Sequence, residues 1–154
     1  MADKTKNVFV SHYHEDEDGI KNMKTLIGDT LTIKNSSVTS DKFNRAQNPE
    51  YIKRLLRLRI QWASKVIVLI GPNTYNSEWV DYEINAAHKK GKPIIGVYLR
   101  GAKDSDVPDT LNDYADAIVG WNKDSIIGAL SGSSDFVNAD GTQRPYNGGN
   151  RSTC

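Results

Sequence analysis

Residues 65–84 constrain the fold of this chain more than any other stretch. An uninterrupted apolar run at 66–70 ends at Gly71-Pro72, and a polar loop and a helix-like segment follow. A short run that is apolar throughout is typical of a strand buried on both faces, as in a parallel sheet. Parallel sheets of this kind bind ligands in the crevice beyond the carboxyl ends of their strands. Glu83, early in the helix that follows, is therefore the first candidate for chemistry.

Length and composition indicate one globular domain without a nucleic-acid or membrane partner. The chain has 154 residues and a formal net charge of +1, which indicates neither a polyanionic partner nor an acidic solvating role. Its longest apolar run, 66–70, is far shorter than the ~20 residues of a membrane span. The N-terminus is polar and Cys154 is the one cysteine, so we expect a cytoplasmic protein without internal disulfides.

Apolar periodicity predicts strands and helices that alternate along most of the chain. The predicted strands cover residues 7–11, 31–38, 65–70, 93–99 and 117–121. The predicted helices cover residues 16–29, 50–63, 78–90 and 123–130, with a helical turn at 111–115. Because several strands are apolar throughout, we expect a three-layer α/β domain. Its central parallel sheet should have about five strands in flavodoxin order.

The last part of the chain has a different composition. Residues 131–154 are rich in Ser, Gly, Asn and Asp and show little periodicity. Segments of this composition bury too little apolar surface to offset the entropy of ordering. We therefore expect a folded domain at residues 1–130 and a flexible C-terminal tail at residues 131–154.

Four motifs, in their order and spacing, resemble those of the TIR domain family, the Toll/interleukin-1 receptor type. They are Val8-Phe9-Val10-Ser11-His12-Tyr13 followed by Asp16, the apolar run with Gly71, Trp79-Val80-Asp81-Tyr82-Glu83-Ile84, and Pro93-Ile94-Ile95-Gly96-Val97. More closely, the chain resembles the bacterial TIR-like (ThsB-type) proteins of the Thoeris anti-phage defence system. The resemblance covers about residues 6–130 and implies the flavodoxin-like fold of that family.

The resemblance implies two alternative functions. Some TIR domains are non-catalytic interaction modules that assemble with other TIR domains. Others cleave the nicotinamide–ribose bond of NAD+, and the Thoeris type makes cyclic or otherwise modified ADP-ribose signals that activate a separate effector. The second alternative predicts an NAD+ nucleosidase or ADP-ribosyl cyclase in bacterial antiviral immunity. It would consume NAD+ as its substrate, without a resident cofactor. Self-association and a phage-derived trigger are further partners that the resemblance implies.

Glu83 is the predicted catalytic residue. Enzymatic members of the family carry a glutamate in a Trp-x-x-x-Glu-Ile setting, which Trp79 and Glu83 match. Departure of nicotinamide leaves positive charge on the ribose, and one fixed carboxylate can stabilise that charge by preorganised electrostatics. Glu83 shares a helical stripe with Trp79 and Ala86, beside the core stripe, so we expect it to be partly desolvated. The alternative is a solvated Glu that pairs with Lys or Arg.

The predicted substrate-binding residues lie at strand ends, in the loops after them, or on the helix that carries Glu83. They are Ser11, His12, Tyr13, Phe43, Asn44, Asn73, Tyr75 and Trp79. Phe43 and Asn44 are included because the loop after the second strand borders the site in this family. For the loop residues the alternative is ordinary turn and capping chemistry, and for Trp79 it is a place in the core.

Other activities are disfavoured by the residues present. The acidic and histidine residues at 12–18 match no zinc-ligand spacing, so no metal site is predicted. The basic residues at 53–59 fall mostly opposite the apolar stripe of their helix, which indicates a solvated face. The chain has neither a Gly-x-Ser-x-Gly nor a Gly-x-Gly-x-x-Gly motif, which disfavours serine-hydrolase and dehydrogenase sites. A receiver domain would need a phosphorylatable Asp where Ile70-Gly71-Pro72 stands.

Overall fold

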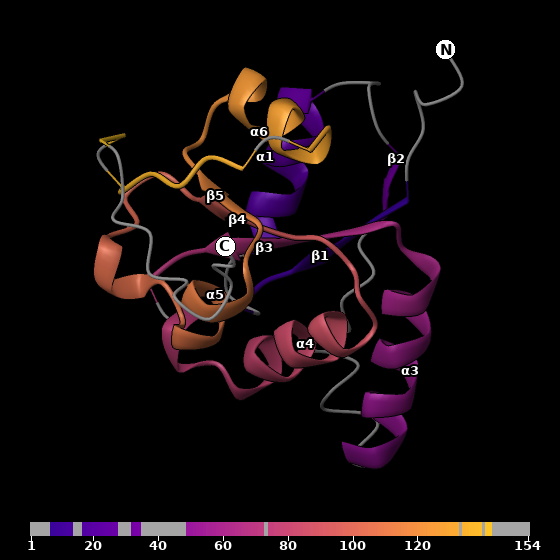
Figure 1. Ribbon diagram of the computed structural model, residues 1–154. Helices are drawn as coiled ribbons and strands as arrows, with labels where there is room; N and C mark the ends of the chain where they lie inside the picture. The colour runs from indigo at the N-terminus through magenta and orange to yellow at the C-terminus, as the bar shows by residue number, and fades with distance from the viewer. Residues whose placement is uncertain are drawn as a thin grey trace, which may run out of the picture.

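The computed structural model describes residues 7–13, 17–27, 32–34, 49–72, 74–132, 134–139 and 141–142. Its centre is a five-stranded sheet in the order β2-β1-β3-β4-β5 (Figure 1). The strands, all paired in parallel, are β1 (Asn7–Ser11), β2 (Thr32–Lys34), β3 (Lys65–Ile70), β4 (Ile94–Tyr98) and β5 (Ala117–Val119). This is the flavodoxin order, so the predicted fold class is confirmed.

Helices connect the strands close to where periodicity predicts them. They are α1 (Glu17–Ile27), α3 (Pro49–Trp62), α4 (Glu78–Lys89), α5 (Asp109–Tyr114) and α6 (Lys123–Leu130), with 3-10 turns η4 (Thr74–Asn76) and η5 (Asp104–Asp106). Ser77 caps α4, and its side chain accepts a hydrogen bond from the backbone N–H of Val80 at 3.2 Å. This cap satisfies a backbone donor that the first turn of a helix otherwise leaves unpaired.

Two predicted segments need comment. Of the strand predicted at 31–38, residues 32–34 form β2 and pair with β1, and the rest of that segment lies outside the described residues. Residues 100–108, between the predicted strand at 93–99 and the predicted helical turn at 111–115, contain η5. There the Asp106 carboxylate accepts from the backbone N–H of Lys103 at 2.8 Å and closes the turn. Residues 41–48, between the predicted strand at 31–38 and the predicted helix at 50–63, lie outside the described residues.

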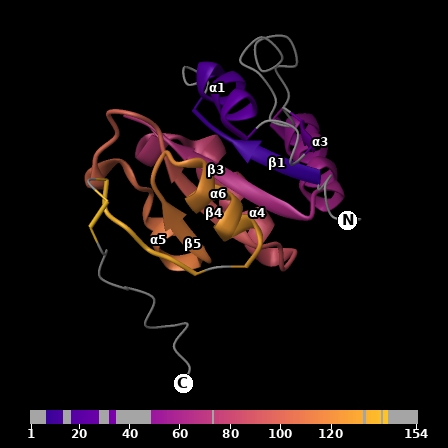
Figure 2. The same cartoon turned by 90° about the horizontal axis from the view of Figure 1, so that it is seen from above.

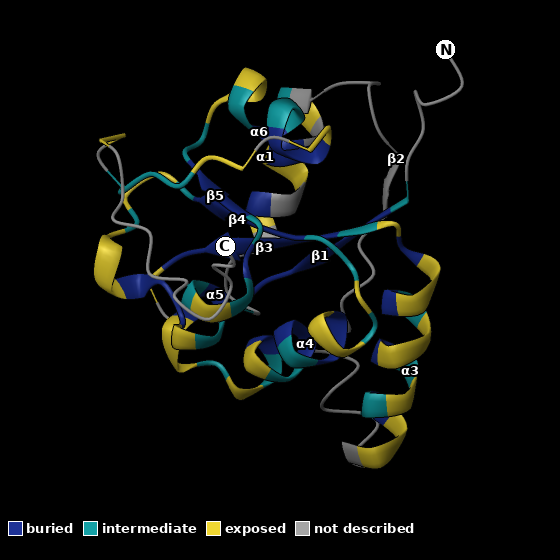
Figure 3. Cartoon of the chain, in the orientation of Figure 1, coloured by how far each residue is buried: buried dark blue, intermediate teal, exposed yellow. Residues whose placement is uncertain are grey.

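Alternation of strand side chains divides the core into two layers. On one face, residues such as Phe9 and Val68 pack with α3, α4 and α5. On the other face, residues such as Val10 and Ile67 pack with α1 and α6. The buried strands lie between these two sets of helices (Figures 1 and 3). Each fully buried aliphatic side chain stabilises the fold by about 1.5–3 kcal/mol, so the sheet is a firm frame for the loops at its carboxyl edge.

Part of the segment predicted as a tail packs against the domain. The backbone N–H of Ile118 in β5 donates to Asp135 at 2.8 Å, and that of Val137 donates back to Ile118 at 2.9 Å. Phe136 and Ala139 contact the core layer on the α4 side. The packed chain therefore continues past α6 to Ala139, and residues 143–154 lie outside the described part. Within the described residues, no helix combines the length and apolar character of a membrane span.

The close approach of α5 to β4 gives a test of the packing. A methyl group on Gly96 would lie 2.9 Å from the Leu111 side chain and 3.3 Å from that of Ile70, and Leu111 is fully buried. Gly96→Ala should therefore lower the free energy of unfolding by about 1–3 kcal/mol, the usual cost of overpacking. The matched control is Gly120→Ala, because nothing lies within 4 Å of that position. Equal stability of the two variants in urea unfolding would contradict this packing.

Candidate active site

Glu83 is buried on the face of α4 that meets the sheet. Its side chain is 2% exposed, and its helical neighbours Val80, Ile84 and Ala87 are fully buried. The sequence predicts a partly desolvated Glu83 at the edge of the core. In the structure Glu83 is buried more deeply than that. The solvated, ion-paired alternative does not describe this residue.

Ser11, the last residue of β1, holds the Glu83 carboxyl group. The Ser11 hydroxyl donates a hydrogen bond to Oε1 of Glu83, and Ser11 is itself fully buried. The two residues are 72 positions apart in the sequence and meet only in the folded domain. A buried carboxyl group that accepts such a bond has a fixed orientation, because moving away would leave it without a partner in the core.

The strand order explains why this pair forms. β1 and β3 are neighbours in the sheet (Figure 2). Ser11 pairs with Val68 in the register of these two strands. The chain leaves β3 towards one side, through β4 to β5, while β1 pairs with β2 on the other side. This is the topological switch point of the sheet, where connections diverge and ligands bind in open α/β folds. α4 is the next α-helix after β3, reached through η4, and it carries Glu83 to that point.

Burial gives Glu83 unusual acid–base behaviour. Desolvation raises the pKa of its carboxyl group from an ordinary value of 4.5 to about 8, and the Ser11 hydrogen bond opposes this shift. The charged form is disfavoured because the surrounding core solvates a carboxylate poorly. At neutral pH the side chain is therefore mostly a neutral acid in the folded domain. A cation brought next to it would favour the carboxylate and lower its pKa.

The other residues predicted for the site are distributed as follows. His12 is buried and Tyr13 is half-buried, both directly after Ser11 at the end of β1. Trp79, one turn before Glu83, is partly buried and packs against the core, so its ring has both a core contact and an accessible part. Tyr75 is 57% exposed in η4. The predicted residues Phe43, Asn44 and Asn73 lie outside the described residues.

The loop between β3 and α4 is fixed by a buried threonine. The Thr74 hydroxyl accepts from the backbone N–H of Gly71 at 2.7 Å and donates to the carbonyl of Leu69 at 3.2 Å. These two bonds satisfy backbone groups at the end of β3. The turn therefore holds the start of α4, and with it Glu83, at a set height above the sheet.

Sequence reasoning missed a contact between α3 and α4 beside Glu83. Arg57 donates to the Tyr82 hydroxyl at 3.0 Å, and the Lys53 ammonium lies 5.5 Å from the centre of the Tyr82 ring. The Tyr82 ring also meets Trp79 edge-on, with 6.1 Å between ring centres. Lys53 and Arg57 therefore pack against α4, rather than forming only a solvated face. The sequence feature that could have indicated this contact is Tyr82, the aromatic residue directly before Glu83.

Among the described residues, Glu83 belongs to no candidate metal site and lines neither of the two pockets given below. Within the described residues, no group of three or more His, Cys, Asp or Glu side chains is placed to hold a metal ion. Two pockets, of about 510 and 490 Å³, are lined by other residues. The first lies beside α1 and the ends of β4 and β5, and the second lies at the start of β4.

These features define a flavodoxin-like α/β domain with a buried acid at its switch point. The fold is similar to that of the CMP N-glycosidase BcmB of Clostridium botulinum, with a TM-score of 0.51 and 16% identity. That likeness covers 82% of this chain and 98% of the other, and at this identity it shows the fold alone. A sequence model of the family described as "Thoeris protein ThsB, TIR-like domain" matches residues 9–104, more than half of the chain. The chain belongs to this ThsB TIR-like family, as its motifs predict.

Two curated relatives carry names that bear on activity. The first, "Putative cyclic ADP-D-ribose synthase ThsB1" of Bacillus cereus, is 42% identical over 53 residues, which is 34% of this chain and 28% of that protein. The second, "Putative cyclic ADP-D-ribose synthase TIR2" of Cytobacillus dafuensis, is 23% identical over 120 residues, 77% of this chain and 32% of that protein. The chain thus matches about a third of the length of each relative.

The raised pKa of Glu83 predicts a pH-dependent stability that a neutral side chain removes. A group whose pKa is higher in the folded than in the unfolded state contributes its full stability at pH values below its unfolded-state pKa. That contribution is lost as the pH rises through its folded-state pKa. For Glu83 that window runs from 4.5 to about 8. Glu83→Gln stays neutral and can still accept from Ser11. Relative to this variant, the wild type should lose a few kcal/mol of unfolding free energy across the window.

The measurement is urea unfolding of both proteins at several values within this pH window. Glu78→Gln is the matched control, since Glu78 is exposed on the same helix. Its difference from the wild type should not change with pH by a comparable amount. A difference between wild type and Glu83→Gln that is constant with pH would show that Glu83 has an ordinary pKa.

Proposed function

We propose that this domain cleaves the nicotinamide–ribose bond of NAD+ and forms an ADP-ribose-type signalling nucleotide in anti-phage defence. The observation that carries the proposal is the buried Glu83, held by Ser11 at the switch point of the sheet. Family membership and the names of the two relatives support NAD+ as the substrate and a cyclic product. The product would reach a downstream effector, and a phage-derived trigger would act on the domain.

The chemistry requires little of the protein beyond one well-placed acid. When the bond between the ribose carbon and the pyridinium nitrogen breaks, both electrons stay on the nitrogen. Nicotinamide leaves as a neutral molecule and the ribose becomes an oxocarbenium cation. The Glu83 carboxylate, beside the ribose, would stabilise that cation in a site where water screens the attraction little. No general acid is needed, because the leaving group is already cationic.

The raised pKa of Glu83 fits this role. In the empty site the carboxyl group is mostly neutral, which spares the domain the cost of a buried unpaired charge. A bound nicotinamide–ribose group brings a positive charge to the same place, and that charge favours ionisation of Glu83. We infer that NAD+ binding releases a proton from Glu83. The charge that serves catalysis would then form only when substrate is present.

The fate of the cation decides the product. Attack by a nitrogen of the adenine of the same molecule, followed by loss of a proton, gives a cyclic product. Attack by water, with the same loss of a proton, gives ADP-ribose. A site that excludes water favours cyclisation, and the depth of Glu83 in the core supports a dry reaction centre.

The alternative is a non-catalytic TIR module that assembles with other TIR domains. A specific observation favours it: Tyr51, Leu58 and Trp62 on α3 are 50%, 61% and 37% exposed. Their spacing places them along one side of the helix, which is unusual for side chains of this size on a monomer. The buried acid does not follow from this alternative, because a scaffold has no use for a desolvated carboxyl group.

The decisive assay incubates the full chain with NAD+ and measures free nicotinamide and ADP-ribose-type products by chromatography. Glu83→Gln should lower the rate by roughly 10²–10³-fold, because it removes the charge that stabilises the cation. Glu78→Gln, at the exposed start of the same helix, should leave the rate within about twofold, since a charge at a helix end contributes little.

Parallel incubation with CMP, the substrate in the name of the structural relative, separates two kinds of N-glycosidase. Release of cytosine without release of nicotinamide would contradict NAD+ as the substrate. Release of nicotinamide at equal rates by wild type and Glu83→Gln would remove Glu83 from the mechanism. Absence of any turnover, together with self-association that Leu58→Glu abolishes, would favour the scaffold alternative.

A further inference from the structure

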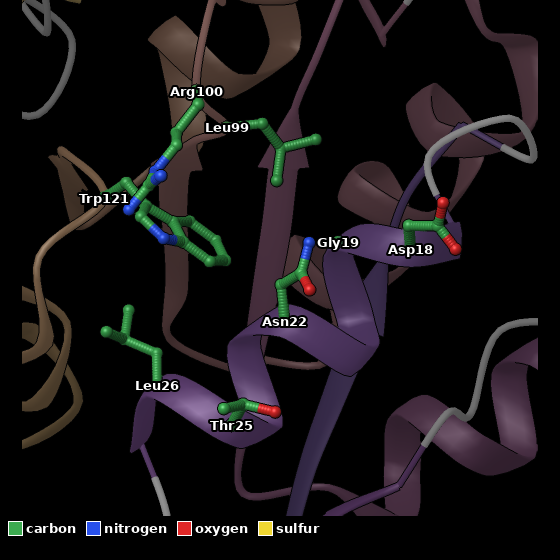
Figure 4. A pocket seen from close by; sticks show the side chains of 8 residues that line it. All are labelled: Asp18, Gly19, Asn22, Thr25, Leu26, Leu99, Arg100 and Trp121. Atoms are coloured by element: carbon green, nitrogen blue, oxygen red, sulfur yellow. The ribbon is translucent and has the colours of Figure 1, made fainter.

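A pocket of about 510 Å³ lies on the α1 side of the sheet (Figure 4). This is the face opposite the one that packs against α4, the helix of Glu83. α1 forms one wall, and residues that directly follow β4 and β5 form the other. Its apolar residues Leu26, Leu99 and Trp121 pack against the core layer of α1 and α6, whereas α4 belongs to the other layer. The pocket has the size of a small-molecule site, for which 300–1,000 Å³ is typical.

One end of this pocket is lined by the indole ring of Trp121 and the guanidinium group of Arg100. The Arg100 side chain extends towards the half-buried Trp121 (Figure 4). An indole offers a stacking surface for a planar base. A guanidinium binds phosphate oxygens through two parallel hydrogen bonds. Both groups leave the carboxyl edge of the sheet on adjacent strands, so they can contact neighbouring parts of one ligand.

The α1 wall supplies polar groups for the rest of such a ligand. Asn22 and Thr25 line the pocket from exposed positions. The Asn22 amide can donate and accept hydrogen bonds, whereas the Thr25 hydroxyl donates to the Lys21 carbonyl at 3.2 Å and offers the ligand an acceptor. Asp18 lies away from Arg100 in the close view, so its charge does not occupy the phosphate end (Figure 4). A carboxylate at that place suits sugar hydroxyls, which donate hydrogen bonds, and disfavours a second phosphate.

The floor of the pocket is closely packed. A methyl group on Gly19 would lie 2.9 Å from the Leu99 side chain and 3.1 Å from that of Leu69. α1 therefore sits directly on the sheet at Gly19, and Leu99 is held between them. The pocket is the space left beside this contact, and its floor cannot collapse inward to fill it.

We propose that this pocket binds a mononucleotide, with its base against Trp121, its phosphate on Arg100 and its hydroxyls towards α1. The site is separate from Glu83 and does not depend on the reaction proposed there. One cation at one end and one carboxylate at the other select a ligand with a single anionic group and a neutral, hydroxyl-bearing part. A ligand with these features has the chemistry of a nucleoside monophosphate.

The test is isothermal titration of AMP into the full chain and four variants. AMP should bind the wild type, Glu83→Gln and Lys89→Gln with equal affinity. Arg100→Gln and Trp121→Leu should each weaken binding by about tenfold or more, since a lost base-stacking or charge-assisted contact has this magnitude. Lys89 is an exposed cation on α4 and controls for general charge effects. Arg100 is exposed, so its variant should keep the fold even where Trp121→Leu loses stability.

Two simpler ligands separate the two contacts. Adenosine should bind with an affinity that Arg100→Gln does not change, and ribose 5-phosphate with one that Trp121→Leu does not change. Absence of saturable AMP binding at millimolar concentration would overturn the proposal. Equal weakening by Lys89→Gln, or loss of binding in Glu83→Gln alone, would overturn it too, because AMP would then bind by general charge or at the Glu83 site.

Discussion

The hydrogen bond from Ser11 to Glu83 is the contact on which the rest of the site depends. A carboxyl group removed from water destabilises a fold by several kcal/mol unless it is neutral or well paired. Here the acid is mostly neutral and accepts from a hydroxyl that is itself buried. The contact depends on the pairing of β1 with β3 in this sheet and on the packing of α4 against these strands. Apolar side chains packed on both faces of the sheet offset the free-energy cost of burying Glu83.

A buried position suits the catalytic role proposed for Glu83, because a developing positive charge is stabilised more by a desolvated acid than by a solvated one. In water, two opposite unit charges about 4 Å apart attract by only about 1 kcal/mol, and the attraction grows as the local dielectric constant falls. A surface glutamate would therefore do little for an oxocarbenium ion. A neutral acid that ionises when a cation binds avoids an unpaired charge in the empty domain. It also presents a full charge during bond cleavage. The burial of Glu83 and its proposed catalytic role thus have one physical origin.

Much of the fold could be predicted from local sequence. The apolar run at 66–70, the Gly71-Pro72 break and the Ser77 cap specify β3, its turn and α4, because each signal acts within a few residues. The strand order could be predicted as well, since continuously apolar strands alternating with helices favour this class of sheet. Family membership could be predicted from motifs between residues 8 and 97, and the family model matches residues 9–104.

The contacts that define the site could not be predicted in the same way. The Ser11–Glu83 bond joins residues 72 positions apart, and the position of Arg57 on Tyr82 depends on how α3 and α4 are set against each other. Asp135 and Val137 pair with Ile118 through backbone groups only, so the polar composition of residues 131–154 gives no indication of this pairing. Local sequence patterns predict which faces of helices and strands are apolar. The extent to which Glu83 is buried depends on the packing of all the elements around it.

The most direct test is the pKa of Glu83 itself, measured by carbon NMR on protein with labelled glutamate carboxyl groups. Glu83→Gln assigns the signal, and nicotinamide mononucleotide supplies the cationic nicotinamide–ribose group without the adenosine. The account predicts a value near 8 in the empty domain, as burial implies, and a clear fall when the cation binds. A value near the ordinary 4.5 in the empty domain, or one that the ligand leaves unchanged, would contradict it.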